Sequence, residues 1–206
     1  MLSLDAPLDT RTEPYRWALA QDLLPAGARA RLRADLPELD AFRRIERAAG
    51  GDKQYGMYVL PLVSRGEPLP GLAQAGPAWR ELAESVLGGA YRAWVEEAVG
   101  AETADCPIDL GVFVFGPGDG VSPHTDKADK WATHVFYLNE EWCEADGGSF
   151  QVRADPSPGS PPVASVVPGG GRSVVFARSD ASWHAVAPIA PTAPEYRYTV
   201  QVEMWR

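Results

Sequence analysis

The chain has 206 residues, of which 45% are apolar and 23% charged, a balance typical of a soluble globular domain. This length fits one domain over residues 1–206, with enough chain to bury a core. The net charge is −9 and the isoelectric point lies near 4.8, so the surface repels phosphate backbones and anionic lipids. Composition therefore argues against nucleic acid and membranes as partners.

The sequence predicts neither a signal peptide nor a membrane-spanning helix. The first residues, MLSLDAPLDTRTEP, contain neither a basic stretch nor an apolar run, so they predict no signal peptide. No segment reaches the roughly 18 consecutive apolar residues of a membrane-spanning helix. Cys106 and Cys143 fit neither a disulfide framework nor a zinc ribbon, and we expect reduced thiols in a cytoplasmic protein.

Helical patterns dominate residues 1–105, which we expect to support a β-rich core and to border the substrate. Pro25 suits the first position of a short helix. From Pro77 to Val99, apolar side chains recur at three and four residues and form one long stripe. Such a stripe predicts a helical surface that packs on a sheet.

Residues 106–206 predict about eight short strands with no helix between them. Runs of β-branched and aromatic residues alternate there with turns rich in glycine and proline. This pattern predicts an antiparallel sandwich or jelly roll, buttressed by the N-terminal helices. The expected strands span 108–115, 121–126, 131–138, 148–153, 163–167, 172–177, 183–187 and 196–204.

A His-x-Asp triplet and a distant histidine suggest a metal site. His124 and Asp126 form the triplet, and His184 follows 58 residues after the aspartate. Residues two apart on a strand share a face, so His124 and Asp126 should point the same way from a strand over 121–126. Two imidazoles and one carboxylate leave three adjacent metal positions open, which suits non-haem Fe(II) oxygen chemistry better than structural zinc.

The last expected strand has an apolar face and a polar face. The polar face, which carries Arg197 and Thr199, either meets solvent or lines a pocket in which the guanidinium grips an anion. In the pocket interpretation, Thr199 could add a hydroxyl donor. The remaining histidine, His134, shares a strand face with Ala132 and Phe136, and we expect it to pack rather than to bind metal.

Several motifs in a fixed order resemble the Fe(II)- and 2-oxoglutarate-dependent dioxygenases, in particular the prolyl-hydroxylase-like branch. The resemblance covers residues 108–206, about half of the chain. That branch has a His-x-Asp, a strand ending in Tyr-Leu-Asn with a tryptophan after it, a Gly-Gly pair, a distal histidine and an arginine that begins the last strand. The matching segments here are PHTDK at 123–127, FYLNEEW at 136–142, DGGSF at 146–150, GRSVVFARSDASWHAV at 171–186 and RYTVQV at 197–202.

The resemblance implies a double-stranded β-helix, a cupin-like jelly roll, and assigns roles to six residues. His124, Asp126 and His184 would bind Fe(II). Arg197 and Tyr137 would hold the distal carboxylate of the co-substrate 2-oxoglutarate, with assistance from Thr199. With O2 as oxidant, the implied reaction is hydroxylation of a C–H bond with release of succinate and CO2.

Two departures from related subfamilies refine this expectation. Nucleic-acid demethylases carry a second arginine six residues after the first, where this chain has Glu203. Halogenating relatives lack the metal-binding carboxylate, whereas Asp126 is present here. The first feature argues against a nucleic-acid substrate, and the second favours hydroxylation or another oxidation over halogenation.

The sequence carries little information about the substrate. We expect a small molecule, such as an amino acid or a natural-product intermediate. The alternatives are a peptide or protein prolyl hydroxylase and a non-catalytic, cupin-like metal-binding or sensor domain. The sequence does not indicate the oligomeric state. Residues that could border the substrate are Lys53, Tyr55, Tyr58, Lys127, Lys130, Trp131, Arg178 and Trp183.

Overall fold

A long antiparallel sheet curls into a barrel and forms the body of the protein. The computed structural model describes residues 1–47, 53–103, 105–157 and 159–206. Within these residues, thirteen strands join one sheet in the order β1-β2-β11-β8-β13-β6-β4-β7-β12-β9-β10, with β3 and β5 paired to β4. The expectation of a mainly β, double-stranded β-helix is therefore confirmed.

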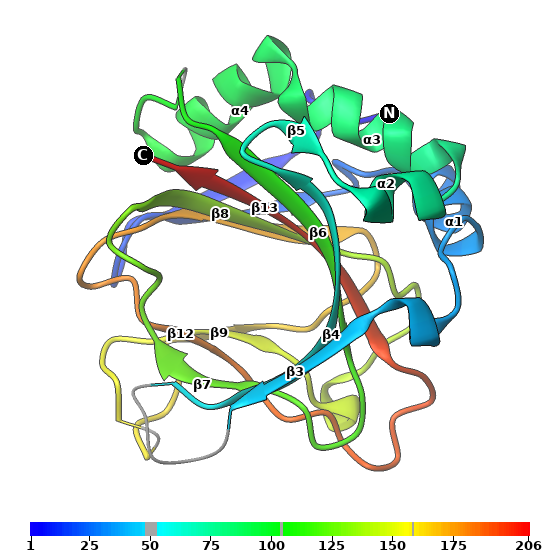
Figure 1. Ribbon diagram of the computed structural model, residues 1–206. Coiled ribbons are helices and arrows are strands. Elements are labelled where there is room, and N and C mark those ends of the chain that lie inside the picture. The colour runs from blue at the N-terminus through cyan, green and yellow to red at the C-terminus, as the bar shows by residue number, and fades with distance from the viewer. Residues whose placement is uncertain (48–52, 104, 158) are drawn as a thin grey trace.

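Figure 1 shows two layers of strands with helices covering the outside of one layer. The layer under the helices contains β8, β13 and β6, and the opposite layer contains β7, β12 and β9. The strands are β1 (Leu8–Arg11), β2 (Trp17–Gln21), β3 (Arg43–Arg47), β4 (Tyr55–Ser64), β5 (Glu67–Pro68), β6 (Ile108–Phe115), β7 (Val121–His124), β8 (Lys130–Tyr137), β9 (Phe150–Val152), β10 (Ala164–Val166), β11 (Arg172–Ala177), β12 (His184–Val186) and β13 (Arg197–Trp205).

The helices are short. They are α1 (Ala26–Ala34), α2 (Pro70–Gln74), α3 (Pro77–Leu87) and α4 (Gly89–Val99), with 3-10 turns η1 (Leu39–Ala41) and η2 (Glu144–Asp146). None of the helices in the described residues is long and apolar enough to cross a membrane.

The apolar stripe of residues 77–99 packs on the sheet as expected, but two helices carry it. Gly88 has an extended backbone (φ −74°, ψ 153°), so it ends α3 and caps the start of α4. Both helices bury their apolar faces in one core with the outward face of β13. That core includes Trp79, Leu82, Val86, Trp94, Val95, Val200, Val202 and Met204.

The first half of the chain is less helical than its pattern suggests, because strands β1–β5 lie there. β2 pairs with β11, and β4 pairs with β6, so partners far along the chain determine these strands. Pro61 also obscures β4 in the sequence, since proline is disfavoured inside central strands. The register shift between Pro61 and Val63 accommodates it.

The eight strands expected in the second half are all present as β6–β13. Their bounds differ mainly where the sequence extends a strand into a turn. β7 ends at His124, so Asp126 lies in the following loop and not on the strand. The alternation argument that placed both side chains on one strand face therefore fails for Asp126.

His134 packs inside the protein, as its strand face predicted. It is 2% exposed, and its ring stacks against Tyr91 and Trp94 at centroid distances of 5.9 and 5.2 Å. The hydroxyl of Tyr91 shares a hydrogen bond with Nδ1 of His134 at 2.9 Å. Burial lowers the pKa of His134 to about 3 from its ordinary value of 6.5.

This shift predicts a pH-dependent stability. Between about pH 6.5 and pH 3 the unfolded chain binds a proton at His134 that the folded chain does not bind, so the free energy of unfolding falls as the pH falls. His134→Asn removes this titration, and the loss of stability per pH unit below 6.5 should shrink by about 1.4 kcal/mol. Urea unfolding at pH 7 and 5, with chelator present, measures both slopes. Equal slopes for the two proteins would contradict the burial of a neutral imidazole.

Candidate metal centre and anion-binding site

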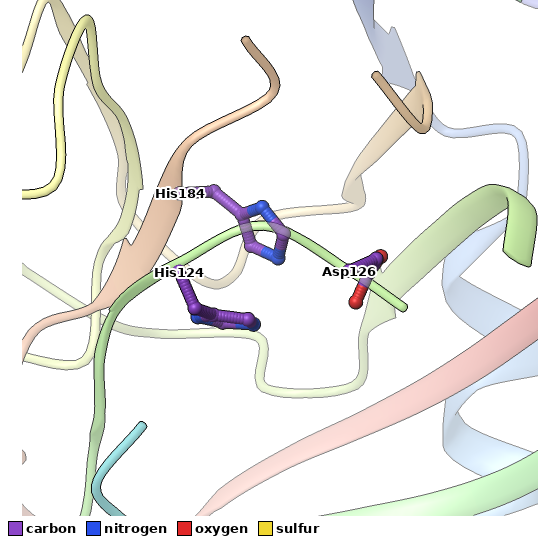
Figure 2. Close-up of side chains that lie close together, drawn as sticks. All are labelled: His124, Asp126 and His184. Atoms are coloured by element: carbon purple, nitrogen blue, oxygen red, sulfur yellow. The ribbon is translucent and has the colours of Figure 1, made fainter. Parts of the chain in front are cut away.

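Two strands of the layer opposite the helices bring the distant histidines together. β7 and β12 are antiparallel neighbours, and His124 at the end of β7 lies directly opposite His184 at the start of β12. Their ring centroids are 4.2 Å apart. Figure 2 shows both imidazoles pointing to the same side, with the carboxylate of Asp126 facing them.

The three side chains have the spacing of a metal site. One ligand atom from each of His124, Asp126 and His184 lies within 4.8 Å of the other two. Both histidines and the aspartate side chain are almost fully shielded from solvent. The structure therefore places the three residues that the sequence singled out around one point inside the barrel.

Backbone carbonyls fix the tautomer of both histidines. Nδ1 of His124 lies 2.9 Å from the carbonyl oxygen of Ser122, and Nδ1 of His184 lies 2.9 Å from that of Ser182. A carbonyl can only accept, so each Nδ1 carries the proton and each Nε2 keeps a free lone pair. Burial lowers the pKa of both imidazoles, which favours the neutral form that binds metals.

Side chains from β8 hold Asp126 in its loop. The hydroxyl of Thr133 donates to Oδ2 of Asp126 at 2.8 Å, and Nζ of Lys130 donates to Oδ1 at 3.1 Å. Burial by itself would raise the pKa of Asp126, but the charge of Lys130 and the Thr133 hydrogen bond keep it below its ordinary value. The carboxylate is therefore ionised, and these two side chains orient it although Asp126 lies in a loop.

Lys130 is itself neutralised by a second carboxylate. It is 6% exposed, and its Nζ donates to Oε1 of Glu203 on β13 at 2.6 Å. Burial opposes the charged form of Lys130, but Asp126 and Glu203 together raise its pKa above the ordinary value. The result is a buried row of alternating charge: Asp126, Lys130 and Glu203.

At the other end of β13, Arg197 is a buried cation that pairs with no carboxylate among the described residues. It is 1% exposed, and its Nε and Nη1 have no hydrogen-bond partner among the described residues. Its guanidinium carbon lies 4.8 Å from the ring of Phe115 and 5.2 Å from the ring of Tyr137. Burial lowers the pKa of Arg197. A charged guanidinium at this position is therefore unfavourable unless a counter-charge accompanies it.

Tyr137 and Thr199 differ in what they can offer an anion beside Arg197. The hydroxyl of Tyr137 is fully buried without a partner among the described residues, and burial raises its pKa to about 12. It can donate to an anion. Thr199 is also buried, but its hydroxyl donates to the carbonyl oxygen of Phe113 at 3.1 Å, which leaves it only acceptor capacity.

Gly148 of the Gly-Gly motif makes room for the guanidinium. Its φ is +68°, a conformation that other residues rarely adopt. A Cβ at this position would lie 2.9 Å from Cδ of Arg197. The glycine is thus required both by the turn and by the close approach of the arginine.

One buried polar group near the metal site was not predicted. Tyr15 precedes β2, is 6% exposed, and its hydroxyl has no partner among the described residues. Its ring meets Phe176 edge-on at 6.2 Å, and Phe176 lies 4.6 Å from His184. Nothing local in the sequence marks Tyr15, because only the pairing of β2 with β11 brings it here.

Three of the eight residues expected to border the substrate interact with Asp126. Lys130 binds Asp126, Arg178 donates to the backbone carbonyl of Asp126 at 3.3 Å, and Lys53 lies within range of the same carboxylate charge. Tyr58 instead stacks on Tyr196 beside Arg44, away from these contacts. The structure gives Tyr55, Lys127, Trp131 and Trp183 no hydrogen bond to the three candidate ligands.

A hollow on the outside of the barrel is a separate feature. It lies over the outer face of β7, β12 and β9, and its lining includes Arg44, Tyr55, Pro123, Gln151 and Ala185. None of the three candidate metal ligands lines it. We place the chemistry inside the barrel, because the ligand atoms and the unpaired guanidinium lie there.

Comparisons with known proteins agree with this architecture. Residues 110–205 match the family model of the 2OG-Fe(II) oxygenase superfamily, where 2OG is 2-oxoglutarate. No curated protein sequence matches significantly.

Solved structures share the fold at low sequence identity. A prolyl-4-hydroxylase from Pseudomonas putida is 22% identical, with a TM-score of 0.66 and 92% of each chain covered. A prolyl hydroxylase from Trichoplax adhaerens, solved with a peptide of hypoxia inducible factor, is 17% identical with a TM-score of 0.62, covering 92% of this chain and 83% of that one. The collagen prolyl hydroxylase of Paramecium Bursaria Chlorella virus-1, solved with 2OG, is 12% identical with a TM-score of 0.56, covering 91% and 94%.

Proteins of this superfamily use Fe(II), 2-oxoglutarate and O2, and the buried, unpartnered nitrogens of Arg197 fit the distal carboxylate of such a co-substrate. The His-Asp-His arrangement likewise fits the metal. Over residues 110–205 the chain thus matches the 2OG-Fe(II) oxygenase superfamily in sequence, and its fold is that of the solved prolyl hydroxylases.

Proposed function

We propose that this protein hydroxylates an unactivated C–H bond of a small molecule. In this proposal His124, Asp126 and His184 hold Fe(II), and Arg197 with Tyr137 holds the distal carboxylate of 2-oxoglutarate. The observation that carries the proposal is the presence, inside one barrel, of a three-residue ligand set and a buried guanidinium without an anion. When bound, the metal, 2-oxoglutarate and O2 supply an oxidation that releases succinate and CO2.

The residues of the chain position the metal and the co-substrate, balance their charges and exclude water from the site. Two neutral imidazoles and one carboxylate leave a net single positive charge on a ferrous ion, which suits a dianionic oxo-acid. Arg197 and Tyr137 give the far carboxylate up to three charge-assisted hydrogen bonds in a buried setting, where such bonds are strong. The rings of Phe150 and Phe176 pack against His184 at 5.5 and 4.6 Å and exclude water from one side of the site.

A small molecule, such as an amino acid or a natural-product intermediate, is the first candidate substrate. Peptide prolyl hydroxylation is the second candidate, since the Pseudomonas and Trichoplax enzymes share the fold. Fold alone does not transfer their substrate.

Succinate release tests the chemistry, and a gain of about 16 Da tests the substrate class. The purified protein is incubated with Fe(II), ascorbate, air and 2-oxoglutarate, first alone and then with free amino acids or with proline-containing peptides. Hydroxylation of a free small molecule supports the proposal, and hydroxylation of peptides alone replaces it with the second candidate. Absence of succinate under every condition would leave a non-catalytic metal-binding domain.

His184→Ala should abolish succinate release, because two ligands do not hold the metal in the required geometry. His134→Asn serves as the matched histidine control, since that residue lies outside the site and stacks on Tyr91 and Trp94. Iron content is measured alongside the rate. A His184→Ala protein that still binds iron and releases succinate at the normal rate would sink the ligand assignment.

Arg197→Met should affect stability and co-substrate binding in opposite directions. The free energy of unfolding of the ligand-free protein should stay level or rise, because a buried cation without a partner is removed. The KM for 2-oxoglutarate should increase roughly 10- to 100-fold through loss of the charge-assisted hydrogen bonds. A variant that loses several kcal/mol of stability and keeps its KM would show that Arg197 is structural.

Glu203→Gln should weaken metal binding roughly tenfold, because it leaves the charge of Lys130 uncompensated beside Asp126. Calorimetric titration with Co(II) measures this affinity without turnover. The double variant Lys130→Met, Glu203→Gln removes the cation as well and should recover part of the loss. Glu67→Gln, on exposed β5, controls for the change in net charge. Equal affinities for Glu203→Gln and Glu67→Gln would contradict the role given to the charge row.

A further inference from the structure

All the lysines of this chain gather at the metal site. The sequence contains only three, Lys53, Lys127 and Lys130, whereas arginine supplies the other basic side chains. The charges that act on Lys53 are those of Asp126, Lys130, Glu203 and Lys127, and Lys53 acts in turn on His124 and His184. In a protein with a net charge of −9, this end of the barrel is a local concentration of cations.

The three lysines are not equivalent. Lys130 is occupied by Asp126 and Glu203 at 3.1 and 2.6 Å. Lys127 is exposed, and its Nζ lies 5.9 Å from the ring of Trp205. Lys53 is half-buried and makes no ion pair with any residue in the described ranges. Within the part of the chain that the structure describes, Lys53 and Lys127 therefore have no carboxylate partner.

Lys53 is held at this position by the pairing of its own segment with β7. The amide of Gln54 donates to Oγ of Ser122 at 2.8 Å, and the amide of Ser122 donates to the carbonyl of Gln54 at 2.9 Å. These bonds tie Lys53 to the strand that ends in His124. Burial lowers the pKa of Lys53 to about 8, so the ammonium form still dominates at neutral pH and is poorly solvated.

An anion beside Lys53 would be distinct from one bound by Arg197. Arg197 begins β13, and Glu203, which contacts Lys130, lies six residues further along the same strand. At about 3.3 Å per residue, the two positions are about 20 Å apart along the backbone. The candidate metal ligand Asp126 contacts Lys130, so the lysines border the metal at the end remote from Arg197.

We propose that Lys53, assisted by Lys127, binds an anionic group of the substrate, a carboxylate or a phosphate, beside the metal site. This inference rests on the proposed function and narrows its substrate to acids. A free amino acid or another small acid offers such a group, whereas the backbone of a residue inside a peptide chain offers only uncharged amides. The ammonium groups orient the acid, and the oxidised C–H bond belongs to the part of the molecule that reaches the metal.

The three lysines make a direct test practical. Protein grown with lysine carrying 13C at Cε gives three reporter signals, which single Lys→Met variants assign. The full chain is loaded with Zn(II) in place of Fe(II) and kept saturated with 2-oxoglutarate, so that added anions do not compete for Arg197. Acetate, inorganic phosphate and uncharged acetamide are then titrated as probes.

The expected result is a saturable shift of the Lys53 and Lys127 signals with acetate or phosphate, and none with acetamide. Whichever anion binds more tightly identifies the acid class. Lys53→Met should raise the dissociation constant of that anion at least fivefold. Arg80→Met, the same charge change at an exposed position of α3, should leave it unchanged. Absence of a saturable shift, or equal effects of the two variants, overturns the inference.

Turnover gives a second measure and separates this inference from the proposed function. For any acid that raises succinate release, its carboxamide should have a kcat/KM at least tenfold lower, and Lys53→Met should lose this discrimination. Amides that work as well as acids overturn the anion site while the oxygenase function stands. Failure to release succinate under any condition overturns the function, whatever the lysine signals show.

Discussion

The pairing of β7 with β12 is the constraint on which the site depends. It sets His124 opposite His184 although the two residues are 60 positions apart, and it brings their ring centroids to 4.2 Å. Ser122 on β7 and Ser182, just before β12, supply the carbonyls that fix both tautomers. Without this register the two imidazoles would lie apart, and the carboxylate of Asp126 would not face both of them. A shift by one residue would turn either ring to the opposite side of the layer.

The charges inside the barrel can be compared with one rule, that a buried ion is destabilising without a counter-ion. Asp126, Lys130 and Glu203 satisfy the rule among themselves and form a row of alternating sign. Arg197 and Lys53 do not satisfy it with any described residue. Arg197 begins β13, whereas the segment of Lys53 is tied to β7, and we interpret each cation as the binding partner of an acid. The barrel thus holds a candidate metal-ligand set together with two cations for which the described residues supply no counter-charge.

Local patterns in the sequence predicted a large part of this arrangement. Alternation along residues 197–204 separated Arg197 and Thr199 from Val200 and Val202, and the two faces do divide between barrel interior and helix-covered core. The same reasoning put His134 in the core and the apolar stripe of residues 77–99 against the sheet. Such signals are reliable because burial of a strand or helix face imposes a period that a single sequence displays. The strands of the first half were missed, because β2 and β4 exist through pairing with β11 and β6 rather than through local preference.

The sequence by itself determined which residue types were available for chemistry: a His-x-Asp triplet, a distant histidine, an arginine on a polar strand face and only three lysines. Tertiary structure alone decided what these side chains do, since distance, burial and counter-charges arise from contacts between segments far apart in the chain. Asp126 left its expected strand and is held by Thr133 and Lys130. Thr199 directs its proton to Phe113, Tyr15 packs beside Phe176, and hydrogen bonds between Gln54 and Ser122 tie the segment of Lys53 to β7. These contacts join segments far apart in the chain, and the groups lose their hydration only once the fold has formed. No local pattern in the sequence therefore encodes them.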